Sequence, residues 1–153
     1  MTAKEQGYTG KVKFVQEYRI EAGEKLLYTE SFFREDGNLS KTIFYKRDGT
    51  VNFQSISTFD ERGNEIRDES FKDGKTTEQW LMQYNDKNQM IFMENFEFGE
   101  RCGTYKFVFD EKGNNIEDLQ YNEESKLTER IVYTFDEHGN EIEDKQLKTT
   151  CGS

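Results

Sequence analysis

The chain has 153 residues, of which 31 are acidic and 21 basic, so its formal net charge is −10. That length suits one domain with a modest core, and the acidic balance argues against binding to nucleic acid or to an anionic membrane, since both require a basic surface. Only 33% of the residues are hydrophobic but 14% are aromatic, whereas disordered chains are poor in aromatics. We therefore expect a folded protein with a solvated surface, whose negative charge favours a basic protein partner or serves simply for solubility.

Turn residues divide the chain at regular intervals. Gly23 to Gly37 is 14 residues and Gly37 to Gly49 is 12, and this alternation of long and short arms continues with a full period of 25 or 26. Such a period is typical of repeat architectures. We predict one β-repeat domain over residues 1–153, with repeats from about 25 to 147, frayed first residues and a frayed tail at 148–153. The predicted strands are roughly 11–20, 25–33, 39–45, 51–59, 66–71, 76–84, 90–97, 101–109, 116–121, 126–135 and 142–147.

One unit recurs at the longer turns. Residues 59–66 read FDERGNEI, residues 109–116 read FDEKGNNI and residues 135–142 read FDEHGNEI, with weaker copies at 84–91 (YNDKNQMI) and from residue 33 (FREDGNL). Asp opens a turn and Gly supplies a positive φ, which predicts a type I turn followed by a left-handed residue in a short hairpin loop. The predicted left-handed positions are Gly37, Gly63, Asn88, Gly113 and Gly139.

The long strands alternate in a way that predicts one aromatic face. Every second residue back from each turn gives Trp80, Met82 and Tyr84 in one strand, and Tyr105, Phe107 and Phe109 in another. Residues so spaced share a face of a sheet. We interpret this group as core or, alternatively, as an aromatic binding groove. No stretch has a helical period, so we predict an all-β antiparallel meander of about eleven strands, a strongly curled open sheet or incomplete barrel with edges protected by charge.

Residues that could carry chemistry are few. The lone histidine, His138, occupies a turn position that other copies fill with Arg or Lys, which indicates a solvated turn tip. The turns are too short for a calcium loop, in which ligands span twelve residues. Asp68, Asp118 and Asp144 recur two residues after an isoleucine, which indicates a ladder of carboxylates on a solvated face. We predict no enzyme, no cofactor and no metal site.

The two cysteines and the N-terminus leave alternatives open. Cys102 and Cys151 have no metal-binding spacing, and a disulfide between them stays an open alternative. No stretch is apolar enough for a signal peptide or a membrane span. The protein is cytoplasmic if Met1 is native, and periplasmic or on the cell surface if a leader was removed.

The FDERGNEI, FDEKGNNI and FDEHGNEI units resemble the YD (Rhs-type) repeat, whose core is Tyr/Phe-Asp-x-x-Gly-Asn. The plainer turns at FKDGK and YKRDGTV resemble elements of MORN-variant repeats. Together they cover roughly residues 25–147. The resemblance implies β-sheet repeats in a bacterial protein; YD repeats build shells in surface and toxin proteins and also occur as short envelope proteins, while MORN-variant repeats occur in immunity proteins.

Two functional hypotheses follow. The first is a non-catalytic protein-binding module, in its sharpest form an immunity or antitoxin protein that neutralises a basic toxin. The second is a structural or lipoprotein-like protein of the cell envelope. For the first, the candidate binding residues are Trp80, Met82, Tyr84, Tyr105, Phe107, Asp68, Asp118 and Asp144. The sequence does not determine the oligomeric state.

Overall fold

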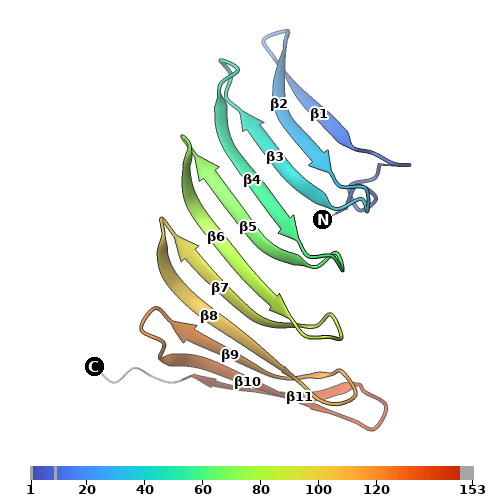
Figure 1. Ribbon diagram of the computed structural model, residues 1–153, viewed down its shortest axis with the longest axis vertical. Helices are drawn as coiled ribbons and strands as arrows, with labels where there is room; N and C mark the ends of the chain where they lie inside the picture. Colours follow the sequence, from blue (N-terminus) through green and yellow to red (C-terminus); the bar gives the residue numbers. More distant parts are fainter. Residues whose placement is uncertain (1, 9, 149–153) are drawn as a thin grey trace. The chain divides into compact units, whose positions relative to one another are not determined.

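The computed structural model describes residues 2–8 and 10–148, and its regular structure is all β (Figure 1). Eleven strands form one sheet in which the strand order follows the chain, and the pairings within each unit are antiparallel. The first and last strands each have one neighbour, so the sheet is an open meander. The predicted fold class is therefore confirmed. The strands are β1 Phe14–Glu21, β2 Glu24–Phe33, β3 Leu39–Tyr45, β4 Val51–Phe59, β5 Glu65–Lys72, β6 Lys75–Tyr84, β7 Met90–Glu97, β8 Glu100–Phe109, β9 Asn115–Asn122, β10 Leu127–Phe135 and β11 Glu141–Lys148.

The chain divides into two compact units, and the division falls inside β6, between Gln79 and Trp80. Each unit is a single layer of strands with little enclosed core. Among the described residues, only Ala3 and Phe33 are buried apolar residues, and both keep a few per cent of their surface exposed. The remaining aromatic side chains are half-buried on the faces of the sheet or exposed.

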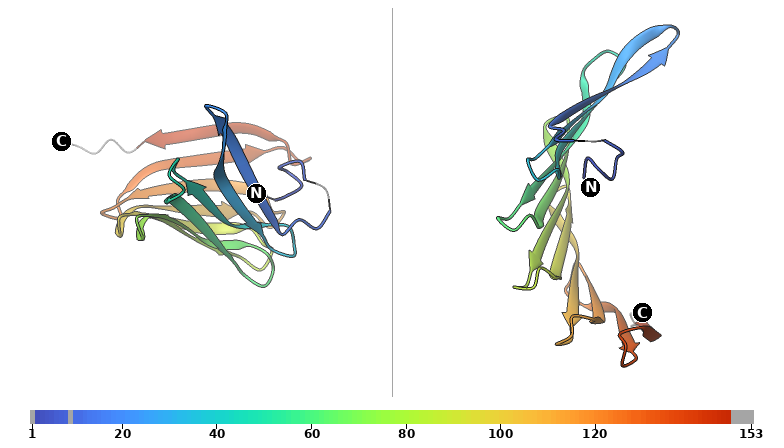
Figure 2. Two further views of the ribbon diagram at one scale, coloured as in Figure 1. Left: turned by 90° about the horizontal axis from the view of Figure 1, so that it is seen from above. Right: turned by 90° about the vertical axis from the view of Figure 1, so that its right-hand side faces the viewer.

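In the first unit the N-terminal segment lies on one side of the strands (Figure 2) and accounts for the two buried apolar residues, Ala3 and Phe33. The backbone N–H of Ala3 donates to Gly37 O over 3.0 Å, and the ring of Tyr8 lies 6.3 Å from that of Phe33 in an edge-on arrangement. The expectation of frayed first residues was wrong, because Phe33 offers an apolar surface that these residues cover. The predicted tail lies outside the described residues apart from Lys148, which ends β11.

The second unit contains most of the aromatic group that the sequence predicts. Trp80 and Tyr105 lie with their ring centroids 6.3 Å apart, and Met93 is opposite Tyr105 in the register. Gly103, which pairs with Asn95, has little room for a side chain, since a Cβ there would lie 3.1 Å from Tyr121 O. Two strands therefore approach closely at this point.

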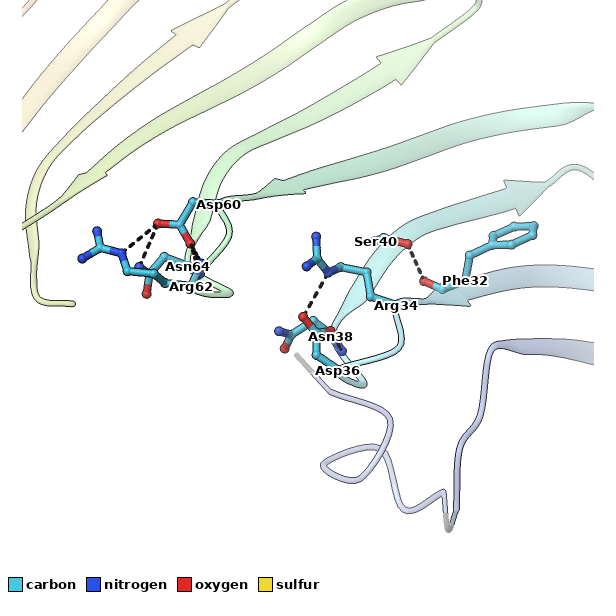
Figure 3. A network of polar contacts seen from close by, with 8 residues as sticks. All are labelled: Phe32, Arg34, Asp36, Asn38, Ser40, Asp60, Arg62 and Asn64. Carbon is cyan, nitrogen blue, oxygen red and sulfur yellow. Dashed lines mark hydrogen bonds and ion pairs between the residues drawn. The ribbon is translucent and has the colours of Figure 1, made fainter.

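The recurring FDERGNEI unit forms the predicted hairpin loop. At residues 60–64, Gly63 N–H donates to Asp60 O and Asp60 N–H donates to Asn64 O, with Gly63 at φ +85°. The Asp60 carboxylate accepts the backbone N–H groups of Arg62 and Asn64 and the side-chain amide of Asn64, as Figure 3 shows beside the preceding turn. The side chain thus satisfies the loop backbone. All five predicted left-handed residues have positive φ: Gly37, Gly63, Asn88, Gly113 and Gly139.

The turns at the other ends of the strands are of two kinds. At Ala22-Gly23, Asp73-Gly74 and Phe98-Gly99 both residues have positive φ, which defines the two-residue type I′ turn. The loops at residues 46–50 and 122–126 instead have the same backbone hydrogen bonds as residues 60–64. In the second of these loops Ser125 takes the left-handed position with φ +63°.

A β-bulge follows most turns, and these bulges decide which side chains share a face. After the loop at residues 60–64, Phe59 pairs with Glu65 but Thr58 pairs with Arg67, so Ile66 is an extra residue. An extra residue shifts the alternation of the following strand by one position. The same irregularity leaves one unpaired residue at each of Ser40, Ile116 and Ile142, and, near the other turns, at Tyr28, Asn52, Cys102 and Thr128.

Candidate protein-binding surface

The bulges bring the recurring aspartates onto the aromatic face. Asp118 in β9 lies opposite Phe107 in β8 and opposite Ile131 in β10. Asp144 in β11 lies opposite Tyr133, and in the first unit Asp68 lies opposite Ser57. Asp144 is exposed, as expected for a solvated face, whereas Asp68 and Asp118 are half-buried. Simple alternation from the turn does not place these aspartates beside the aromatic residues, because it ignores the extra isoleucine.

In the second unit this face has a shallow depression of about 180 Å³ across β8, β9 and β10. Two rows of side chains build it: Phe107, Asp118 and Ile131 in one, and Tyr105, Gln120 and Glu129 in the other. Aromatic rings therefore flank two carboxylates that sit on neighbouring strands. The lining residues are Tyr105, Phe107, Asp118, Leu119, Gln120, Glu129 and Ile131.

Hydrogen bonds hold the Asp118 carboxylate in place. Its Oδ2 accepts the Tyr133 hydroxyl over 2.8 Å and its Oδ1 accepts the Asn115 side-chain amide over 2.6 Å. Burial, the bond to Asp118 and the nearby charges of Glu141 and Asp144 raise the pKa of Tyr133 to about 12. Tyr133 therefore keeps its proton at neutral pH and acts as a hydrogen-bond donor, and each carboxylate oxygen of Asp118 keeps a lone pair for another donor.

The second carboxylate of the depression is also fixed by a neighbour. Glu129 accepts a short hydrogen bond from the side-chain amide of Gln146 in β11. An amide partner orients the carboxylate without neutralising it. The hydrogen-bond partners of Asp118 and Glu129 are neutral amides and a hydroxyl, so these bonds leave both negative charges in place.

Charges are segregated between the two faces of β8, β9 and β10. By register, the side that carries Tyr105, Asp118 and Ile131 has carboxylates and no Lys or Arg within these three strands. The three cations of these strands, Arg101, Lys106 and Arg130, fall on the opposite side, where Arg101 pairs with Glu94 and Arg130 with Glu117. Within β8, β9 and β10 the aromatic face therefore carries carboxylates and no cation, while in the neighbouring strand β11 Lys148 lies opposite Glu129 in the register.

In the first unit the Asp68 carboxylate accepts hydrogen bonds from the hydroxyls of Ser55 and Ser57, over 3.2 Å and 2.9 Å. A serine is activated as a nucleophile by a base such as histidine, and the lone histidine of the chain is elsewhere. His138 lies at a turn with its side chain 76% exposed, as its repeat position predicts. In the described part of the chain, no three His, Cys, Asp or Glu side chains are grouped to hold a metal ion.

The other predicted binding residues are divided by position. Trp80, Met82 and Tyr84 lie at the end of β6 and Trp80 contacts Tyr105, so these residues belong to the aromatic face of the second unit. Alternation back from the turn already predicts Tyr133 on this face, but Gln120 and Glu129 were absent from the prediction. Alternation corrected for the bulges at Ile116 and Thr128 would have found them. Of the cysteines, Cys102 has a free thiol at a bulge, and Cys151 lies outside the described residues.

The sequence matches no protein-family profile and no curated protein. The resemblance to YD and MORN-variant repeats therefore stays a prediction. Within residues 2–8 and 10–148 there is no helix long and apolar enough to cross a membrane.

Proposed function

We propose that the protein is a non-catalytic protein-binding β-repeat module and that its binding surface is the aromatic face of the second unit. The observation that supports this most strongly is the charge segregation in β8, β9 and β10, where carboxylates stand among half-exposed aromatic rings without a cation. Solubility alone does not require that the positive and negative charges lie on different faces of the sheet.

The surface suits a Lys or Arg side chain of a basic partner. A cation seated in the depression would contact the rings of Tyr105 and Phe107 and the carboxylates of Asp118 and Glu129. Aromatic faces attract cations, and desolvated carboxylates add charge-assisted hydrogen bonds. The net charge of −10 would add fast, salt-sensitive association.

A defined basic peptide provides the first test. The chain has a single tryptophan, Trp80, and it stacks near Tyr105, so its fluorescence reports on this surface. A Lys- and Arg-rich peptide should change the emission and bind more weakly as salt rises, while an acidic peptide of equal length should leave it unchanged. The D118N/E129Q variant should bind the basic peptide at least about tenfold more weakly, as expected for loss of two charged contacts.

The matched control is E111Q/E123Q, which removes the same two charges from exposed turns of the same unit. Equal weakening by the two double variants would show that only net charge matters, which would contradict a site on the aromatic face. Thermal melts of all variants confirm that each is folded.

The sharpest form of this function is neutralisation of a basic toxin, and it has its own experiment. The purified protein is used to capture partners from a lysate of its source organism at low salt, and bound proteins are released at high salt. The captured protein should be a basic polypeptide encoded beside this chain, and the D118N/E129Q variant should fail to protect cells from it. If no protein encoded beside this chain binds, the proposal of an immunity protein is wrong. The peptide-binding experiment still tests the binding surface independently.

A further inference from the structure

The outer edge of β1 is free to pair with another strand. β1 has β2 as its one neighbour in the sheet, and in Figure 1 no described segment runs along its other side. The N-terminal segment is held at the loop between β2 and β3, where Ala3 N–H donates to Gly37 O. An edge strand of this kind presents a row of unpaired N–H and C=O groups, which is a template for another chain.

The side chains of β1 protect this edge only in part, since three of its eight residues are charged: Glu17, Arg19 and Glu21. Phe14, Tyr18 and Ile20 lie on one face of the strand and are 45%, 45% and 77% exposed. Edge strands are usually protected from pairing by charged residues, especially lysine, and by proline. This chain has no proline. The opposite edge differs, since five of the eight residues of β11 are charged: Glu141, Glu143, Asp144, Lys145 and Lys148.

The charges of β1 select one register for pairing with a second copy. A two-fold axis perpendicular to the sheet pairs the two β1 strands antiparallel and leaves the same face of each copy on the same side of the joined sheet. Odd-numbered residues of one copy must then lie opposite odd-numbered residues of the other, and even opposite even. With Tyr18 on the axis, Glu17 lies opposite Arg19 of the second copy, twice by symmetry. Moving the axis to Glu17 or Arg19 would instead place like charges opposite each other, which is destabilising. An axis at Ile20 would also place Arg19 opposite Glu21, but only residues 19–21 of β1 would then be paired.

Both charged side chains are already ordered by contacts within their own chain. The Arg19 guanidinium lies 3.7 Å from the centroid of the Tyr28 ring and 3.3 Å from Glu21. Glu17 accepts the Thr29 hydroxyl over 2.6 Å. Fixed side chains lose less conformational freedom on pairing.

We propose that β1 pairs antiparallel with β1 of a second copy, centred on Tyr18, to form a two-fold symmetric dimer joined by Glu17–Arg19 ion pairs. The dimer extends the sheet across the axis and covers the exposed edge. The interface lies in the first unit and is independent of the surface proposed for binding a basic partner.

Charge reversal tests both the interface and its register. By light scattering coupled to size exclusion, the wild type should move from the monomer mass of 18.2 kDa to twice that mass as concentration rises. E17R and R19E alone should each stay monomeric, because each places like charges opposite each other. An equal mixture of E17R and R19E should recover the dimer, since every Arg then faces a Glu.

The control is E143R on the outer strand β11, which should dimerise as the wild type does. A wild type that is monomeric at every concentration would overturn the proposal, as would a dimer that survives E17R or is lost only in E143R. Hydrogen exchange of the wild type gives a second measurement that needs no variant. The amides of β1 should become more protected as concentration rises, and unchanged exchange there would also contradict the interface.

Discussion

At the scale of the residue, glycine serves this chain in two physically different ways. Gly63 is required by its backbone, because φ is +85° while the nearest atom to an added Cβ, Asp36 Oδ2, is 4.0 Å away. Gly103 has no positive φ, and a Cβ there would approach Tyr121 O to 3.1 Å and Asn95 Oδ1 to 3.3 Å. The first glycine sets a turn, and the second allows two strands to meet.

The turn glycine leads to a prediction about stability. We expect Gly63→Val to lower the free energy of unfolding by about 1–2 kcal/mol, because a β-branched residue is forced into the left-handed region. Gly113→Val should cost at least as much, since Gln89 Nε2 would lie 3.3 Å from the new Cβ. Denaturant unfolding measures both changes.

Asn88 is the natural control for these variants. It already has φ +62° at the equivalent position, and asparagine tolerates this geometry better than other non-glycine residues. Asn88→Gly should therefore change stability by only a few tenths of a kcal/mol. If both valine variants unfolded like the wild type, the turn assignment would be wrong.

At the scale of the element, the hairpin loop is a closed set of hydrogen bonds around one carboxylate. The bonds from the side chain and backbone of Asn140 hold the pKa of Asp136 below its ordinary value of 3.8, and Asp60 is held low in the same way by Asn64. The copy at residues 85–89 replaces the acid with an amide. There Asn85 accepts the N–H groups of Lys87 and Gln89 and donates to the Gln89 side chain.

This comparison predicts how the loops respond to acid. Because the folded-state pKa of Asp136 is lowered, its contribution to stability is complete above the ordinary pKa and is lost as pH falls through the folded value. The D136N/N140Q variant copies the amide pair of residues 85–89. Its melting temperature should therefore fall less than that of the wild type between neutral pH and about pH 3.

The control for the acid experiment is E137Q, which removes a charge from the same loop without replacing a hydrogen bond to the backbone. Equal acid sensitivity of E137Q and D136N/N140Q would show that general charge, not the loop carboxylate, causes the loss of stability at low pH.

At the scale of the whole molecule, net charge acts against a protein with little enclosed core. The ion pairs of the described residues are largely exposed, for example Lys13–Glu35 with side chains 70% and 92% accessible, and exposed pairs contribute little. The net charge of −10 instead favours self-repulsion.

We therefore expect the melting temperature to rise when sodium chloride is raised from low to about 0.15 M, where the Debye length is about 8 Å. Screening of repulsion should outweigh the loss of surface ion pairs. A melting temperature that falls as salt is added would mean that the ion pairs dominate.

The sequence by itself determined the strands, the turns and the repeat. Alternation of aromatics, Asp and Gly at fixed spacing, and the absence of a helical period are local signals, and local hydrogen bonds around Asp60 and its counterparts realise them. The number and order of the strands follow, because tight turns can connect only neighbouring antiparallel strands. β1 begins at Phe14 rather than at residue 11, where the alternation is weak.

Only the tertiary structure decided which side chains share a face. The bulge at Ile116 moves Asp118 onto the aromatic side, and the bulge at Thr128 brings Glu129 opposite Gln120. Residue type alone does not identify the extra residue of a bulge, since Ile, Ser, Tyr, Asn, Cys and Thr all occupy this position in one bulge or another. The depression and the charge segregation depend on pairing between strands, and a single extra residue reverses every face that follows it.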